Sequence, residues 1–214
     1  MRPDVAARCR ADAAASPLAD PAIAYPAWYL RRWHFLPEGY LSRRSAVLYD
    51  SLIRTVYNTG SERRIIRALV GLLRRKGGGQ DTLELGCGPG RALAAAREHL
   101  PHARLTGVDL SPFMLELARD RLAQRGVELL HADACALPLS SGAFPAITAT
   151  HFFGHLPRDV AAAAFAEARR VLSRDGRLYV VDHSWHPRQA PGFRSVGTLR
   201  LLRGMVRIEA FQPD

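Results

Sequence analysis

The sequence predicts an α/β fold: a doubly wound, mostly parallel β-sheet that follows N-terminal helices and ends in an antiparallel hairpin. Three observations favour this architecture. From residue 80 onward, short apolar runs alternate with helical periodicity, and repeated βα units are typical of parallel sheets with helices on both faces. A glycine-rich turn follows the first of these runs. The chain has 214 residues, 48% of them hydrophobic, which suits one α/β domain and is too short for two.

The first 79 residues predict an arm followed by helices. Residues 1–24 are rich in Ala, Pro and Asp without a clear period, and we expect a frayed arm. Residues 25–42 hold six aromatic side chains among charges: Tyr25, Trp28, Tyr29, Trp33, Phe35 and Tyr40. Apolar residues recur at spacings of three and four over 43–57 and 61–75, which predicts two amphipathic helices.

Strands and helices alternate beyond residue 80. Strands are expected over residues 82–85, 104–108, 127–131, 144–150 and 177–182, and helices over residues 91–99, 112–125 and 159–172. Ser111 is expected to cap the second of these helices, and Asp175–Gly176 to form a turn before the fifth strand. Residues 194–201 and 205–211 resemble the two strands of the closing hairpin.

Charge supports a division between residues 1–79 and 80–214. Residues 1–79 carry 14 basic and 6 acidic side chains, so they hold +8 of the chain's formal charge of +10. Such an excess attracts an anionic partner, although a solvated Arg-rich helical surface gives the same count. We expect residues 1–79 to form a substrate lid or a membrane-facing surface, and residues 80–214 to form the catalytic core.

Several protein classes are excluded by composition. The three cysteines, Cys9, Cys87 and Cys135, are an odd number with wide spacing, which indicates neither a disulfide framework nor a metal knuckle. No window approaches 18 uninterrupted apolar residues, and the N-terminus lacks the apolar core of a secretory signal. We therefore expect a cytoplasmic protein, with peripheral contact to an anionic membrane through the basic helix 43–57 as a further hypothesis.

The strongest motif is the glycine-rich turn within Leu83–Arg91, which carries Gly86, Gly88 and Gly90 between a buried strand and a helix. Glycine permits positive φ and lets the backbone approach a ligand closely. The spacing is G-x-G-x-G. A dinucleotide fingerprint would need a third glycine at the position of Arg91, and the Gly-Lys-Ser/Thr of a phosphate-binding loop is absent.

Two acidic residues follow the next two predicted strands. Asp109 ends the second strand, where a carboxylate can accept both ribose hydroxyls of a nucleoside. Asp133 follows the third strand and can accept a hydrogen bond from an exocyclic adenine amine. Taken singly, the first could be an N-cap and the second a loop acid. Their order and spacing after the glycine turn favour one ligand crevice at the carboxyl ends of the strands.

These residues resemble the class I S-adenosylmethionine-dependent methyltransferases. Three segments are similar to the family's three cofactor motifs: Leu83–Arg91, Val108–Ser111 and His131–Pro138. Within the class, Tyr49–Gly60 and Val181–Ser184 resemble the branch that methylates ubiquinone and menaquinone precursors. The resemblance spans about residues 45–211. It implies a Rossmann-like fold, S-adenosyl-L-methionine as the cofactor and S-adenosyl-L-homocysteine as the product.

The resemblance also implies a cofactor site. Its expected residues are Glu84, Gly86, Cys87, Gly88, Gly90, Asp109, Leu110, Met114, Asp133, Ala134 and Thr150. In this interpretation Glu84 anchors the glycine loop or the cofactor's amino group, Asp109 holds the ribose, and Asp133 with Ala134 reads the adenine edge. Leu110 and Met114 lie against the adenine in this interpretation, and Thr150 faces the methyl donor.

Catalysis requires alignment of the acceptor, and a base only if the acceptor must lose a proton. Candidate catalytic residues are His151, His155, His183 and Tyr49, because imidazole titrates near neutrality and the tyrosine could cap the site. For each of them, an ordinary loop or packing role is the more common alternative. The histidine pairs lack Cys or carboxylate partners at ligand spacing, so no metal is expected. The aromatic N-terminal segment predicts a small, hydrophobic acceptor: quinone-like, lipid-like or a secondary metabolite.

Two departures from the family and three rival functions are visible. Pro145 replaces a common acidic residue, and the helix usual between strands five and six is nearly absent, so the resemblance does not identify the acceptor.

A nucleic-acid methyltransferase would fit the basic N-terminal third, but no Asn-Pro-Pro-Tyr-like tetrapeptide or RNA-binding module is present. A cofactor-binding protein without transferase activity remains open. An NAD enzyme is disfavoured by Arg91. The oligomeric state, monomer or homodimer, is open as well.

Overall fold

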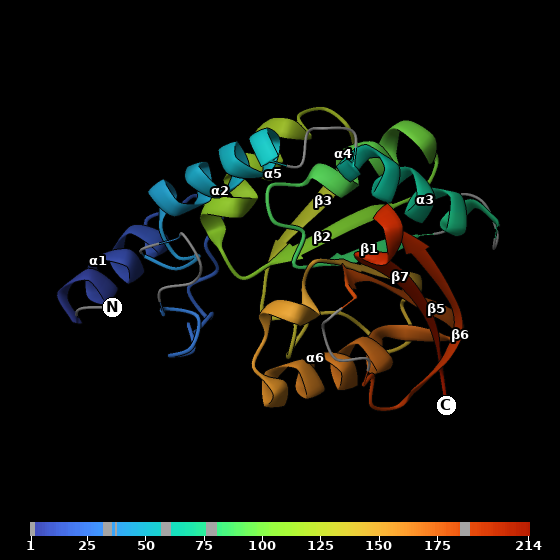
Figure 1. Ribbon diagram of the computed structural model, residues 1–214. Coiled ribbons are helices and arrows are strands. Elements are labelled where there is room, and N and C mark those ends of the chain that lie inside the picture. The colour runs from blue at the N-terminus through green and yellow to red at the C-terminus, as the bar shows by residue number, and fades with distance from the viewer. Residues whose placement is uncertain (1–2, 32–35, 37, 57–60, 76–80, 185–188) are drawn as a thin grey trace.

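The computed structural model describes residues 3–31, 36, 38–56, 61–75, 81–184 and 189–214. Its strands are β1 (Thr82–Leu85), β2 (Leu105–Asp109), β3 (Val127–His131), β4 (Phe144–Thr150), β5 (Leu172–His183), β6 (Phe193–Leu201) and β7 (Val206–Pro213). They form one sheet in the order β3-β2-β1-β4-β5-β7-β6 (Figure 1). Neighbouring strands are parallel except at β7, which is antiparallel to both β5 and β6. The predicted architecture, a mostly parallel sheet with an antiparallel C-terminal hairpin, is confirmed.

Helices cover both faces of this sheet. They are α3 (Ser61–Arg75), α4 (Arg91–His99) and α5 (Pro112–Arg121) on one face, and α6 (Arg158–Val171) on the other (Figure 1). Ile65 and Leu93 belong to the apolar core on the first face, and Phe165 belongs to the core on the second. The helix after β1 and the helix after β4 thus lie on opposite faces. In open α/β sheets, ligands bind at the point where this reversal occurs.

The N-terminal region differs from the expected frayed arm. Helix α1 (Pro3–Ala14) forms there, and its Cys9 and Ala13 are buried in a third core together with Phe113 and Met114 of α5. Alanine has the highest helix propensity, and packing of one face against α5 supplies the stability that a short helix lacks in isolation. Helix α2 (Arg43–Val56) also packs on α5, at the same side of the sheet (Figure 1).

Most predicted elements match the structure to within two residues, with two further corrections. Helix α5 ends at Arg121 and not at residue 125, because Gln124 adopts a left-handed conformation with φ 61°. The expected turn at Asp175–Gly176 lies within β5, which starts directly after α6. There the pairing register between β4 and β5 shifts between Phe144 and Ala146, next to a proline that cannot donate to the ladder. The boundary proposed between residues 79 and 80 stays a prediction.

Gly90 offers a test of how tightly α4 packs on α5. Its φ is +74°, and a Cβ built there lies 3.0 Å from Ala118 Cβ and 3.0 Å from Leu122 Cδ1. We expect Gly90→Ala to lower the free energy of unfolding by about 2 kcal/mol, because backbone strain adds to overpacking. Gly71→Ala is the matched control, since a Cβ at this position within α3 meets nothing within 4 Å. It should raise the same free energy by about 0.5–1 kcal/mol in urea unfolding. Equal effects of the two substitutions would contradict this packing.

Candidate cofactor and acceptor site

Two adjoining cavities open at the carboxyl ends of the first four strands. The first, of about 810 Å³ including its open part, is lined by the ends of β2, β3 and β4 and by aromatic residues of the N-terminal segment. The second, of about 1530 Å³ on the same measure, lies between the glycine loop and helices α2 and α3. The two share the following residues: Tyr40, Tyr49, Gly86, Gly88, Thr150, His151 and His155. Volumes of this order suit small ligands.

The glycine loop separates the two cavities. A different physical reason accounts for glycine at each of its three positions. Gly86 has φ 61°, and a Cβ there would lie 2.3 Å from the ring of Phe152, so only glycine lets this ring cover the loop. Gly88 has φ 51°, and nothing lies within 4 Å of a Cβ built there, so the loop leaves open space at this position. Gly90 lines neither cavity and instead packs α4 onto α5.

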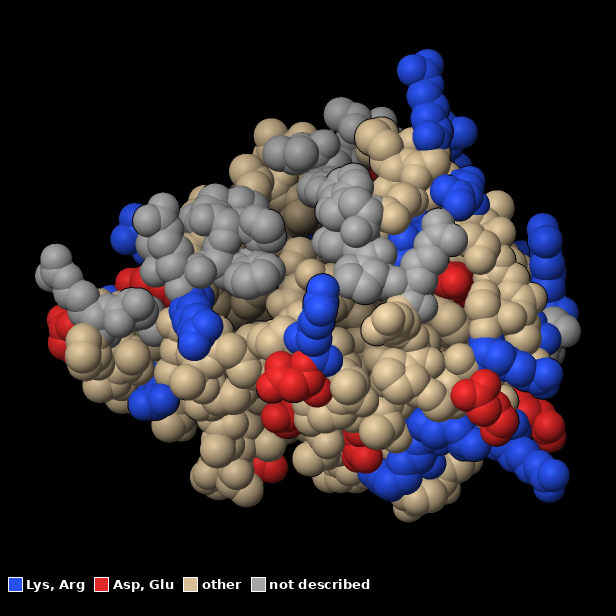
Figure 2. Space-filling model, turned by 60° about the horizontal axis from the view of Figure 1, so that its bottom comes forward, with Lys and Arg blue, Asp and Glu red and all other residues tan. Residues whose placement is uncertain are grey.

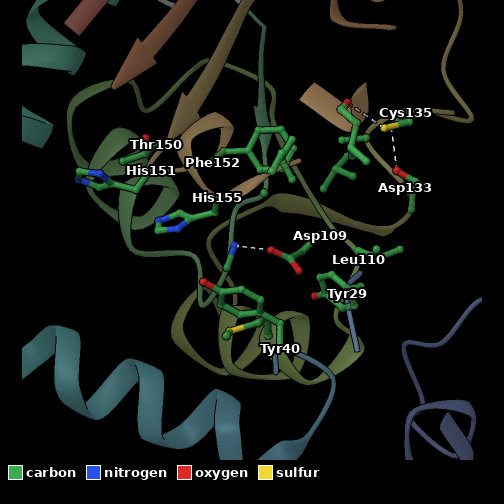
Figure 3. Close-up of a pocket in the computed structure, with 18 of the residues that line it drawn as sticks. Tyr29, Tyr40, Asp109, Leu110, Asp133, Cys135, Thr150, His151, Phe152 and His155 are labelled. Carbon is green, nitrogen blue, oxygen red and sulfur yellow. Dashed lines mark hydrogen bonds between the residues drawn. The ribbon is translucent and has the colours of Figure 1, made fainter. Parts of the chain in front are cut away.

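Asp109 forms the floor of the first cavity (Figure 3). Its Oδ2 accepts a hydrogen bond from the Gly88 backbone N–H at 2.8 Å, and its Oδ1 accepts one from the Ser111 N–H at 2.8 Å. Burial raises the pKa of this carboxyl to about 6, although these backbone N–H groups act in the opposite direction. Ser111 also caps α5 as predicted, because its Oγ accepts from the Met114 N–H.

The remaining predicted cofactor residues of β2 and β3 line the same cavity. They are Leu110 and Met114, which follow β2, and Asp133 and Ala134, which follow β3. The Asp133 carboxylate is fixed by the Cys135 backbone N–H, which donates to Oδ1 at 2.9 Å. The structure therefore brings acidic groups from two strand ends to one apolar slot, as the sequence predicted.

Glu84 lines the second cavity from β1 and is 2% exposed. Burial raises the pKa of this carboxyl to about 8, while the Thr150 hydroxyl opposes the shift and Asp109 adds to it. Cys87 is buried beside it in the same cavity, and its thiol pKa is raised well above the ordinary value by burial. The glycine loop thus stands between two buried carboxyl groups, Glu84 on the side of the second cavity and Asp109 on the side of the first.

Three predicted catalytic histidines gather at one end of the second cavity. His151 follows β4 in a left-handed conformation, φ 52°, and its N–H donates to the Val181 carbonyl at 2.8 Å. Its ring centroid lies 5.0 Å from that of His183, and its Nδ1 lies 3.9 Å from Asp182 Oδ1. Positive φ at a residue that is not glycine is strained, and such strain clusters at functional sites. His155 lines both cavities, and Figure 3 shows it with Asp109 and Tyr40 around the first. Among the described residues, no group of three or more His, Cys, Asp or Glu side chains could hold a metal.

Aromatic residues from the N-terminal segment close the first cavity. The ring centroids of Tyr25 and Tyr29 are 6.4 Å apart, those of Tyr29 and Tyr40 are 6.0 Å apart, and those of Tyr40 and Tyr49 are 6.0 Å apart. Trp28 lines the cavity as well. The sequence predicted a capping role for Tyr49 but gave no site role to Trp28, Tyr40 or Phe152. The density of aromatic residues over 25–42 was the available signal for two of these.

Ion pairs attach α2 and α3 to the helices of the core. Arg91, at the start of α4, donates from Nε to Glu62 Oε1 at 2.7 Å, and its Nη2 contacts the second oxygen of the same carboxylate. Arg121 binds both oxygens of Asp50, at 3.0 and 2.9 Å. Arg91, which breaks the dinucleotide fingerprint, therefore fixes the helix that forms one wall of the second cavity.

The comparisons with known proteins find methyltransferases similar to this chain. Residues 82–176 match the family described as "Methyltransferase domain". These residues are thus similar to a methyltransferase domain, and they make up a little less than half of the 214-residue chain. The TehB-like SAM-dependent methyltransferase of Corynebacterium glutamicum has the same fold, with a TM-score of 0.64 at 18% identity over 81% of this chain and 100% of that one.

Two curated relatives are similar to this chain over about two thirds of its length. The chain is 37% identical over 136 residues to the ubiquinone/menaquinone biosynthesis C-methyltransferase UbiE of Desulfotalea psychrophila, covering 63% of this chain and 53% of that protein. It is 36% identical over 146 residues to the demethylmenaquinone methyltransferase of Thermus thermophilus, covering 67% of this chain and 64% of that protein. The matches thus span between about half and two thirds of the relatives' length.

Replacing Glu84 by Gln tests whether its carboxyl is protonated in the fold. With a pKa raised from 4.5 to about 8, the folded protein retains a proton that the unfolded chain releases between these values. The free energy of unfolding therefore falls as pH rises through this window. Glutamine resembles the protonated acid, so Glu84→Gln should match the wild type near pH 5 and be more stable near pH 8.5 in urea unfolding.

The exposed Glu98, on α4, provides the control for this experiment. Its side chain is 60% exposed, so Glu98→Gln should follow the wild-type pH dependence over the whole range. A Glu84→Gln protein that is less stable than the wild type near pH 8.5 would show that the buried carboxylate is ionised and well paired.

Proposed function

We propose that the protein is a methyltransferase that transfers a methyl group from S-adenosyl-L-methionine to a small, mainly hydrophobic acceptor. One observation carries this proposal: an acid-lined cavity and an apolar, histidine-lined cavity meet at the same glycine loop. A nucleoside-bearing donor in the first cavity would place its reactive end at the boundary with the second. The match to the methyltransferase domain family supports this assignment.

The residues of the first cavity fit the cofactor. Asp109 offers a buried carboxylate to ribose hydroxyls, and Asp133 and Ala134 line the slot where the adenine edge would lie. The open space over Gly88 admits a ligand next to the backbone, which any Cβ would narrow. Glu84 provides an acidic group for the ammonium of the methionine portion, and that positive charge would favour the ionised form of Glu84.

The second cavity supports an apolar acceptor with one ionisable group. Its walls include Leu52, Ile53 and Ile65 of helices α2 and α3, while His151 and His183 provide polar groups at the opposite end. This lining fits a quinol-like ring better than a nucleic acid. The similarity to enzymes of ubiquinone and menaquinone biosynthesis points to the same class of acceptor.

The reaction then needs alignment, exclusion of water and the removal of a proton. S-adenosylmethionine supplies an activated methyl group on a sulfonium. Tyr40 and Tyr49 line both cavities at their junction and exclude water from it. Positioning of this kind is worth about 7–11 kcal/mol of a barrier. His151 is our candidate to accept the acceptor's proton, because the buried carboxylate of Asp182, 3.9 Å from its Nδ1, stabilises the imidazolium that results.

Asp109→Ala tests the cofactor site. Loss of a charged hydrogen-bond acceptor costs about 1.5–3 kcal/mol, so we expect the Kd for S-adenosylhomocysteine, measured by calorimetry, to rise by at least tenfold. Asp120→Ala on α5 is the control, because that side chain is 72% exposed and far more accessible than Asp109; its Kd should not change. Equal affinities of the two variants would contradict the proposed ribose contact.

We also propose that α2 rests on an anionic membrane from which a lipid-like acceptor is collected. Val47 and Leu48 are 49% and 41% exposed on α2, next to the exposed Arg43 and Arg44, while Leu52 of the same helix lines the second cavity. Apolar and basic side chains on one exposed helix face are typical of interfacial helices. No helix in the described ranges is long and apolar enough to cross a membrane.

Flotation with vesicles tests the membrane contact. The protein should float with phosphatidylglycerol-containing vesicles at low salt and not with pure phosphatidylcholine vesicles, because the attraction is electrostatic and screened by salt. Replacing Val47 and Leu48 together by Ser should abolish flotation without lowering the affinity for S-adenosylhomocysteine. Failure of the unmodified protein to float with anionic vesicles would refute the membrane contact.

A further inference from the structure

The wall that closes the first cavity belongs to a segment with little regular structure. Trp28 and Tyr29 line the cavity, yet residues 15–31 contain no helix or strand and form only local turns, such as the hydrogen bond from the Tyr29 N–H to the Pro26 carbonyl. No ladder of backbone hydrogen bonds fixes this segment to the sheet among the described residues. Its position therefore depends on side-chain contacts, and these determine whether the cavity is closed.

His131 makes two of these contacts with one ring. The Asp20 backbone N–H donates to its Nδ1 at 2.8 Å, and the Tyr25 hydroxyl lies 3.3 Å from its Nε2. A third anchor lies earlier in the segment, where the Ser16 hydroxyl donates to Glu116 at 2.7 Å. The imidazole at the end of β3 thus holds the segment at Asp20 and Tyr25, while Tyr29 further along is buried in the third core beside Ser111.

The same imidazole also holds the floor of the first cavity. Its Nε2 lies 3.0 Å from the carbonyl oxygen of Leu110, the residue that follows Asp109. Because Nδ1 must accept from the Asp20 N–H, the proton of the neutral ring lies on Nε2 and is donated to this carbonyl. One side chain therefore connects the segment that covers the cavity with the backbone that lines it.

We propose that His131 is a positioning residue: its neutral ring latches residues 16–31 over the first cavity, and its protonation releases them and weakens cofactor binding. This inference rests on the proposed function, because it assumes that the first cavity holds the cofactor. Protonation of Nδ1 would set an N–H against the Asp20 N–H and remove the only acceptor that this contact has.

The charges around His131 define the pH range of such a latch. Burial lowers the pKa of His131 from 6.5, and the Leu110 carbonyl and Asp20 oppose this shift. The other titratable groups near the ring are Tyr25 of the segment, Asp109, which pairs with His131 between β2 and β3, and Asp133 two residues further on. Asp109 also titrates in the acid range, so a test must separate the imidazole from this carboxyl.

Two substitutions achieve this separation. In His131→Asn, the side-chain oxygen takes the place of Nδ1 as an acceptor for the Asp20 N–H but does not become protonated. In His131→Phe, the ring remains and the acceptor is lost. Asp109 is unchanged in both variants, so its titration contributes equally to both and to the wild type.

The first measurement needs no ligand. Hydrogen exchange of peptides covering residues 16–31, normalised to peptides of α6, should be slow in the wild type at pH 7.5 and severalfold faster at pH 5.5, because one imidazole of ordinary pKa changes the opening equilibrium by up to about tenfold over this range. His131→Phe should exchange rapidly at both pH values, and His131→Asn slowly at both. If His131→Phe fails to fold, the wild type and His131→Asn at the two pH values still decide the matter. Equal normalised exchange of the wild type and His131→Asn at both pH values would overturn the latch.

The second measurement is the Kd for S-adenosylhomocysteine at the same pH values. We expect His131→Asn to bind within threefold of the wild type at pH 7.5 and at least threefold more tightly than the wild type at pH 5.5. Unchanged relative affinities would refute the link between the latch and binding. If the wild type binds no S-adenosylhomocysteine at either pH, the proposed cofactor site is wrong, while the exchange measurement still judges the latch.

Discussion

The Asp109 carboxylate is the interaction on which the arrangement of the site depends. One oxygen holds the Gly88 N–H of the loop after β1, and the other holds the Ser111 N–H at the start of α5. Three segments are therefore fixed by one buried group, and the open space over Gly88 exists because its loop is tied back to β2. The desolvation that raises the pKa of this carboxyl is the cost of placing it on the floor of a cavity rather than in water.

The two cavities are also joined mechanically. The loop that carries Gly88 continues into α4 at Arg91, which is paired with Glu62 of α3, a residue of the second cavity. Arg121 of α5 holds Asp50 of α2 in the same way. These pairs are partly buried and form a connected set, so solvent and salt screen them less than isolated surface pairs. The wall of the second cavity and the glycine loop are thus joined through these ion pairs, although the sequence analysis assigns them to different regions.

The sequence predicts the elements that depend on residues close together in the chain, and it does not predict contacts between residues far apart in the chain. Strand β1 and helix α4 were predicted with their observed bounds, because apolar runs, a glycine turn and a proline signal are local. The contact between Asp20 and His131 joins residues 111 positions apart, and no local sequence pattern predicts it. Helix α1 was missed because its Ala-rich sequence lacks an apolar stripe and gains its partner, Phe113, only in the folded chain. The motif spacing placed Gly90 in the cofactor site, whereas the geometry gives it a packing role.

The N-terminal segment also affects the order in which the chain folds. Ser16 and Asp20 are synthesised before their partners, Glu116 and His131, which lie 100 and 111 residues later in the chain. The segment therefore cannot make its contact with His131 until β3 has been synthesised and has paired with β2. The cavity can therefore close only after β3 has been synthesised, and until then the tyrosines and the tryptophan of the segment have no folded core to pack against.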